Sequence, residues 1–175
     1  ISFIDDASRF SVVYAMAKKT EALDKLKEYL LELSSRGIKL KVLQSDNGGE
    51  YTSRHFREFC KSQGIKQRTS APHKQAENGI AERFWLTIFN GARAMLGVSG
   101  RGGEYWSLAA THMNLLRNLA PTKGILPGRP LIPVVPFDLF PNQGITASDL
   151  RKKLRVWGTT AYQHVEKASR KKLDP

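Results

Sequence analysis

Two carboxylates stand at positions that suit the chemistry of phosphodiester bonds. Asp46 follows the apolar stretch 39–45 and precedes Asn47-Gly48-Gly49, a sequence typical of a sharp turn. Glu82 lies near the start of a predicted helix, and thirty-five residues separate it from Asp46. Carboxylate oxygens are preferred by Mg²⁺ and Mn²⁺, and a pair of such cations can stabilise both oxygens of an in-line displacement. The two acids fit part of such a metal site, for which a third acid is expected.

Each acid also has an ordinary structural interpretation. An Asp before Asn-Gly is common in surface turns, and a Glu in the first turn of a helix usually interacts with the helix dipole. These alternatives stay open for each residue taken alone. Metal ligation is favoured only by the pair together with the motifs around it.

The N-terminal half of the chain predicts the elements that must position Asp46. Residues 1–4 and 10–17 are rich in β-branched and aromatic side chains, and the turn sequence DDASR between them predicts a hairpin. Thr20 is a plausible N-cap for the helix that follows, and Gly37 ends that helix. The predicted elements are strands at 1–4, 10–17, 39–45 and 65–69, and helices between Thr20 and Gly37 and from about 53 to 63.

The C-terminal half predicts helices more than strands. The segment 70–78 lacks periodicity and is expected to be a loop, and helices are predicted at about 79–97 and 104–118. Six prolines between 121 and 141 exclude long helices there. The tail is expected to form a small β unit. The predicted division is a core over 1–120, a proline-rich connector over 121–148 and a basic extension over 149–175.

The charge of the chain favours a polyanionic partner. It has 28 Lys and Arg against 16 Asp and Glu, a net charge of +12, and residues 151–175 hold eight basic side chains against two acidic ones. Nucleic acid is the usual partner of such a surface, although a solvated basic tail is the alternative. The single cysteine, Cys60, excludes an internal disulfide. No membrane span or signal peptide is indicated, so we expect a soluble intracellular protein.

Several motifs together resemble the integrase core of retroviruses and retrotransposons, in its copia-type branch. They are FIDDASRF (3–10), SDNGGEY (45–51), NGIAER (78–83), EYWSLAATHMNLLRNLAPTKG (104–124) and LRVWGTTAYQHV…RKKLDP (154–175). The resemblance implies an α/β, RNase H-like fold, a mixed sheet flanked by helices with a basic C-terminal extension. It also implies dependence on Mg²⁺ or Mn²⁺, trimming of element DNA ends and their insertion into host DNA. Such integrases are multimers, so a homo-oligomer is expected. The expected location is the nucleus, with cytoplasmic virus-like particles as a second one.

Carried onto this chain, the resemblance implies that Asp46 and Glu82 are the second and third catalytic acids and metal ligands. Asn47 would shape the turn that aims Asp46, Asn78 would begin the catalytic helix, and Arg83 would neutralise a DNA phosphate or form a surface salt bridge. Further nucleic-acid contacts are expected in the loop and the basic tail, at His73, Lys152, Lys153, Lys171 and Lys172.

Three departures from the family pattern keep a second function open. The leading aspartate of the family belongs to a strand upstream of residue 1, and Asp5 and Asp6, which match the acidic pair of the hairpin, are its candidate substitutes. The loop reads HKQAE, and Phe84-Trp85-Leu86 replaces basic and polar positions. The alternatives are an inactive, nucleic-acid-binding remnant and a different RNase H-like nuclease, which the copia-type tail disfavours.

Overall fold

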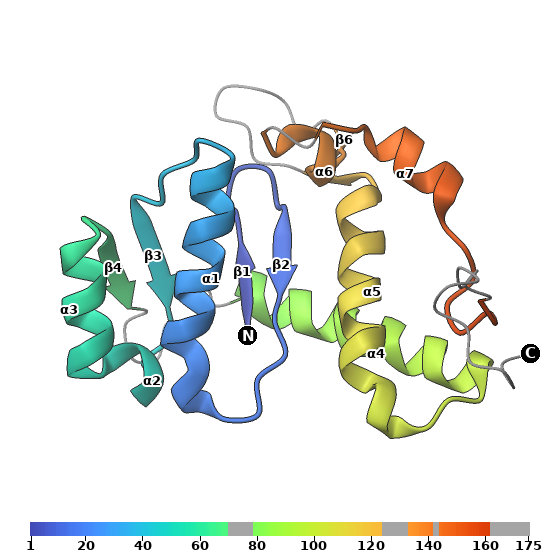
Figure 1. The fold of residues 1–175 in the computed structure, drawn as a ribbon, viewed down its shortest axis with the longest axis horizontal. Coiled ribbons are helices and arrows are strands. Elements are labelled where there is room, and N and C mark those ends of the chain that lie inside the picture. Colours follow the sequence, from blue (N-terminus) through green and yellow to red (C-terminus); the bar gives the residue numbers. More distant parts are fainter. Residues whose placement is uncertain (70–78, 124–132, 142–143, 162–175) are drawn as a thin grey trace, which may run out of the picture.

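The computed structural model describes residues 1–69, 79–123, 133–141 and 144–161 (Figure 1). Predictions for His73, Asn78, Lys171 and Lys172 lie outside this part of the chain. The elements, in chain order, are β1 (Ser2–Ile4), β2 (Ser11–Val13), η1 (Lys19–Glu21), α1 (Ala22–Ser35), β3 (Val42–Ser45), α2 (Gly49–Thr52), α3 (Arg54–Ser62), β4 (Lys66–Thr69), α4 (Gly79–Ser99), η3 (Gly103–Tyr105), α5 (Trp106–Leu119), β5 (Thr122–Lys123), β6 (Pro133–Val134), α6 (Pro136–Leu139) and α7 (Ala147–Lys153).

The N-terminal hairpin is confirmed. Strands β1 and β2 pair antiparallel, and their turn is closed by its own side chains. Asp5 Oδ2 accepts hydrogen bonds from Ser8 N at 2.7 Å and Ser8 Oγ at 2.6 Å. Arg9 adopts a positive φ of 64° and its guanidinium lies 2.6 Å from Asp6 Oδ1. The turn residues are therefore bound to one another.

A β-α-β unit carries Asp46. Strands β3 and β4 pair parallel, with α2 and α3 in the connection between them. Ser53 caps α3, since its Oγ accepts from Phe56 N at 3.4 Å, and Gly64 ends the helix region with a φ of +68°. Strand β3 stops at Ser45, so Asp46 is the first residue beyond its carboxyl end.

The strands in the described part of the chain form three separate pairs, β1–β2, β3–β4 and β5–β6. Antiparallel and parallel pairing are both present, as a mixed sheet requires. The pairs are not joined by strand pairing into one sheet within these residues. In the view of Figure 1, α1 lies between the β3–β4 pair and the β1–β2 pair. Helices α4 and α5 cross on the other side of the hairpin, next to β2.

One core joins the hairpin, the β-α-β unit and the connector. Phe3 stacks on Tyr29 of α1 with ring centroids 4.6 Å apart, and Phe10 stacks on Phe140 at 4.1 Å. The buried members of this cluster are Phe3, Phe10, Leu26, Tyr29, Leu33, Phe56, Cys60, Ile65, Leu119, Phe137, Phe140 and Ala147. The division at residues 120 and 148 stays a prediction, and side chains on both sides of residue 120 share this core.

A second core lies where α4 packs against α5. Ile88 is fully buried against the small side chains Ala109 and Ala110. A Cβ on Gly91 would collide with the sulfur of Met113, so the absence of a side chain there permits the close approach of the two helices. The helix predicted at about 79–97 thus packs against another helix of the same chain.

Helix α5 is held to β2 by a buried polar cluster. Asn118 Oδ1 accepts from Ser11 N at 3.0 Å, and Asn118 Nδ2 donates to Ser11 O at 2.7 Å. Asn114 Nδ2 also donates to Ser11 O, at 2.8 Å. The side chains of α5 thereby satisfy the backbone groups of Ser11 that point away from β1, as a neighbouring strand would.

Three local predictions were wrong. Thr20 is not an N-cap, because it lies inside η1, where Glu21 Oε1 accepts from Lys18 N at 3.0 Å. Helix α2 follows the turn after Asp46 where no helix was predicted. The described part of the tail has no strand, since residues 147–153 form α7 and 154–161 lack regular structure. Thr146 caps α7 by accepting from Asp149 N at 3.1 Å.

Candidate metal centre

Asp46 is presented to solvent by the end of β3. Its side chain is exposed, and its Oδ1 accepts a hydrogen bond from Gly48 N at 2.9 Å. This bond fixes the carboxylate over the turn, and Asn47, also exposed, shapes the turn between them. The strand end and the Asn-Gly-Gly sequence together hold an oxygen ligand in a defined place.

Glu50 brings a second carboxylate to the same turn. The position that a Cβ on Gly48 would occupy lies 2.8 Å from Glu50 Oε2 and 3.0 Å from Asp46 Oδ1. Both side chains therefore converge on the same side of Gly48. Glu50 was not among the site residues predicted from the sequence, although its position four residues after Asp46 could have indicated it.

Tyr51 follows Glu50 in α2 and packs against the core. Burial of its ring raises the pKa of the Tyr51 hydroxyl to about 12, and the negative charges of Glu50 and Asp46 contribute to this rise. The hydroxyl therefore stays protonated at neutral pH and remains a hydrogen-bond donor. The rings of Tyr51 and Phe56 meet in an edge-to-face arrangement with centroids 5.5 Å apart, and this contact anchors the turn to the core.

Glu82 lies in the first turn of α4 with its side chain in solvent, whereas Phe84 two residues later is buried. A Cβ on Gly79 would lie 3.3 Å from an NH1 atom of Arg83, so the Arg83 side chain folds back over the start of the helix. A guanidinium at the N-terminus of a helix adds to the positive end of the helix dipole. The first turn of α4 thus carries one exposed carboxylate and one exposed cation.

Asp5 and Asp6 serve the hairpin turn. Asp5 Oδ2 accepts hydrogen bonds from Ser8, and Asp6 Oδ1 accepts one from the Arg9 guanidinium. These bonds give both carboxylates a structural role within the turn.

Among the described residues, the carboxylates of Asp46 and Glu50 lie together at one turn, and Glu82 lies on a separate element, α4. No group of three His, Cys, Asp or Glu side chains able to hold one metal ion occurs among them. The donor types present, carboxylate oxygens on exposed turns, are those that Mg²⁺ and Mn²⁺ accept. Asp46, Glu50 and Glu82 are the acids that such a centre could use.

The basic tail begins on α7. Lys152 Nζ lies 3.4 Å from Asp149 Oδ1 with a side chain that is 75% exposed, and Lys153 is exposed beside it. An exposed pair of this kind is weak, so both ammonium groups remain accessible to an anionic partner. No helix in the described ranges is long and apolar enough to cross a membrane.

The comparisons with known proteins agree with this arrangement. Residues 1–75, which include the hairpin, β3 and Asp46, match the family model of the integrase core domain. The whole chain is also similar to the retrovirus-related Pol polyprotein from transposon TNT 1-94 of Nicotiana tabacum, with 37% identity over 99% of the length of the chain. The chain belongs to the integrase core family. The resemblance to copia-type retrotransposon integrases is thereby confirmed.

This integrase core spans 12% of the length of that polyprotein. Among solved structures it is similar to the HTLV-2 integrase catalytic core domain in complex with magnesium. The trimeric form is 24% identical with a TM-score of 0.52, covering 67% of this chain and 72% of that one. The dimeric form is 25% identical with a TM-score of 0.53, covering 71% and 77%. A simian T-cell lymphotropic virus intasome is 18% identical with a TM-score of 0.54, covering 67% and 41%.

These likenesses establish a mixed α/β fold of the integrase-core type for the chain. The magnesium, the oligomeric forms and the intasome belong to the proteins in which they were observed.

Proposed function

We propose that this chain is the part of a retrotransposon integrase that carries the second and third catalytic acids, Asp46 and Glu82, for processing and joining DNA ends. In this proposal its strand pairs belong to one RNase H-like mixed sheet. The observation that carries the proposal is the carboxylate of Asp46, which is exposed at the end of β3 and held by Gly48 N at 2.9 Å. The carboxyl end of a strand is where open α/β folds place their ligands.

Asp46 and Glu82 would hold Mg²⁺ or Mn²⁺, with Glu50 as a neighbouring carboxylate. When bound, a pair of such cations stabilises charge on the attacking and leaving oxygens of phosphodiester exchange. Asp46 contributes a preorganised oxygen, because one of its oxygens is already bound to the turn. Arg83, over the start of α4, and Asn78 and Asn47 would contact the DNA strand near the acids.

The basic tail would supply further contacts to the DNA backbone through Lys152, Lys153, Lys171 and Lys172, with His73 contributing from the loop. Lys152 and Lys153 support this by their exposure at the end of α7. DNA is the proposed partner, both as element ends and as target. A homo-oligomer in the nucleus, and in cytoplasmic virus-like particles, completes the proposal.

Strand transfer in Mg²⁺ or Mn²⁺ tests the proposal. Because the resemblance places the first acid upstream of residue 1, the assay compares the 175-residue chain with the chain extended upstream in its own reading frame. Asp46→Asn and Glu82→Gln in the extended protein should abolish end processing and strand transfer. The matched controls Asp24→Asn and Glu28→Gln, exposed acids on α1, should retain both activities. Activity that survives in Asp46→Asn or Glu82→Gln would exclude the assignment.

The second candidate is a nucleic-acid-binding remnant without catalysis. It is favoured by Phe84-Trp85-Leu86, which follows Glu82 and Arg83 where the family has basic and polar positions. It predicts DNA binding by the extended protein with no cleavage or joining in either metal. Absence of activity in both proteins, with DNA binding retained, would select this candidate.

A further inference from the structure

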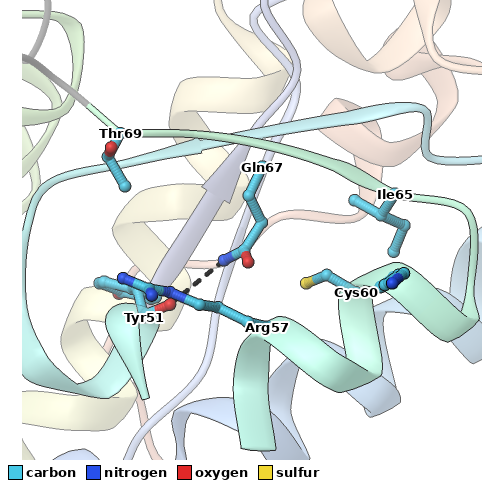
Figure 2. A pocket seen from close by; sticks show the side chains of 7 residues that line it. Tyr51, Arg57, Cys60, Ile65, Gln67 and Thr69 are labelled. Carbon is cyan, nitrogen blue, oxygen red and sulfur yellow. Dashed lines mark hydrogen bonds between the residues drawn. The ribbon is translucent and has the colours of Figure 1, made fainter. Parts of the chain in front are cut away.

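A cavity of about 420 Å³ lies between α3 and β4 (Figure 2). Its lining residues are Tyr51, Arg57, Cys60, Lys61, Ile65, Gln67 and Thr69. Helix α3 supplies one wall, β4 supplies the other, and Tyr51 of α2 closes one end. The cavity adjoins the turn of Asp46, because its lining residue Tyr51 follows Glu50 in α2, which begins directly after that turn.

Among the described residues, the lining is positive and has no carboxylate. Arg57 and Lys61 lie one turn apart on the same face of α3, and both are exposed. Within the described ranges neither side chain forms a salt bridge, whereas Arg54 on the same helix pairs with Glu58 at 2.7 Å. Figure 2 shows the Arg57 side chain extending toward Tyr51. The two cations are thus available to a ligand in the cavity.

The remaining walls supply donors and an apolar floor. The Tyr51 side chain carries a hydroxyl donor, and the Gln67 amide donates to Tyr51 O at 3.2 Å, which fixes α2 against β4 (Figure 2). Cys60 and Ile65 are buried, and burial raises the pKa of the Cys60 thiol, so that it stays neutral at the base of the cavity. A site whose described lining offers two cations and hydroxyl donors, and no carboxylate, is suited to a phosphate group.

We propose that this cavity binds a backbone phosphate of the DNA strand, through Arg57 and Lys61, and so positions that strand beside Asp46. The inference rests on the proposed function, since it takes DNA as the ligand. Arg57 provides a forked set of donors and Lys61 a compact charge, and the two approach the phosphate from one helix. They are positioning residues for DNA and take no part in the reaction at phosphorus.

The dependence of DNA binding on salt measures this contact directly. Arg57→Gln/Lys61→Gln in the full chain, with a short random-sequence DNA duplex and without divalent metal, is compared with Lys25→Gln/Lys27→Gln on α1. The control removes the same charge from lysines paired with Glu28 and Asp24. Loss of one phosphate contact should lower the slope of log K against log salt by roughly 0.9. It should also weaken binding roughly tenfold, while the control changes neither quantity as much.

Two further measurements separate a phosphate contact from a loss of folding and from an effect of net charge. Arg57→Lys/Lys61→Arg keeps both charges and should retain the slope, and thermal unfolding should show that all variants fold. Inorganic phosphate alone should shift the NMR signals of the Arg57 and Lys61 side chains and lose this effect in the double Gln variant. An unchanged salt slope relative to the α1 control would overturn the proposal. Because binding is measured without metal, this result is independent of whether Asp46→Asn abolishes strand transfer.

Discussion

The Asp46 carboxylate accepts a hydrogen bond from the backbone N–H of Gly48 at 2.9 Å. The bond spans two residues, so the conformation of the turn orients the candidate metal ligand. Gly48 contributes a second property, because a Cβ at this position would crowd Asp46 Oδ1 and Glu50 Oε2. The turn thus holds both carboxylates within reach of the same side of its backbone.

Gly48→Ala should therefore impair catalysis more than folding. The new methyl group would displace the Asp46 and Glu50 side chains, and we expect strand transfer by the extended protein to fall roughly tenfold or more. Gly49→Ala is the matched control, because nothing lies within 4 Å of a Cβ there. Denaturant unfolding should separate the two variants by no more than about 0.5 kcal/mol. Equal activity of the two variants would contradict this role of Gly48.

Asn118→Ala should destabilise the fold. The substitution removes the acceptor of Ser11 N in a buried position and should cost about 1–3 kcal/mol. Asn90→Ala, at an exposed position of α4, is the control and should change the free energy of unfolding by about 0.5 kcal/mol or less. Urea denaturation followed by tryptophan fluorescence measures both. If the two variants unfold at the same urea concentration, α5 does not depend on this pair of hydrogen bonds.

Ile88→Ala should weaken the packing of α4 against α5 and lower the free energy of unfolding. Its side chain is fully buried, so truncation leaves a cavity and should cost about 2–5 kcal/mol. Leu86 is 62% exposed on the same helix, and Leu86→Ala should cost far less. Thermal unfolding of the two proteins checks the difference. A comparable loss of stability in Leu86→Ala would mean that the outer face of α4 is buried in solution, as in an oligomer.

Stability should also fall on mild acidification because of His112. Partial burial lowers the pKa of His112, so the folded state binds this proton more weakly than the unfolded state does. The contribution is present above the ordinary value of about 6.5 and is lost as the pH falls below it toward the lowered pKa. His112→Gln should flatten the dependence of unfolding free energy on pH in this window. An unchanged pH dependence in the variant would show that another group is responsible.

Local signals in the sequence predicted much of the architecture. DDASR predicted the hairpin turn, Gly37 marked a helix end, and the stretch before Asp46 predicted a strand that stops at the carboxylate. These succeeded because turn and cap residues act within a few positions of themselves. The prediction of a helix N-cap at Thr20 was wrong, because Glu21 Oε1 accepts from Lys18 N instead. For the tail, the Thr146 and Asp149 pair was an unused helix-start signal.

Long-range relationships could not be derived in this way. The bond between Ser11 and Asn118 joins residues 107 apart, and no period in the sequence connects them. Arg57 and Lys61 have the spacing of an ordinary solvated helix face, and only the position of β4 makes them walls of a cavity. Asp46 and Glu82 were found as chemical candidates from their motifs, and their roles as metal ligands stay a prediction.

The roles of Asp46 and Glu82 as metal ligands are tested by the position of Mn²⁺ in a crystal of the upstream-extended protein, determined by anomalous scattering. Manganese should bind to carboxylate oxygens of both Asp46 and Glu82, and none should occupy this position in Asp46→Asn. Manganese bound elsewhere, with these two side chains ligating nothing, would contradict these roles.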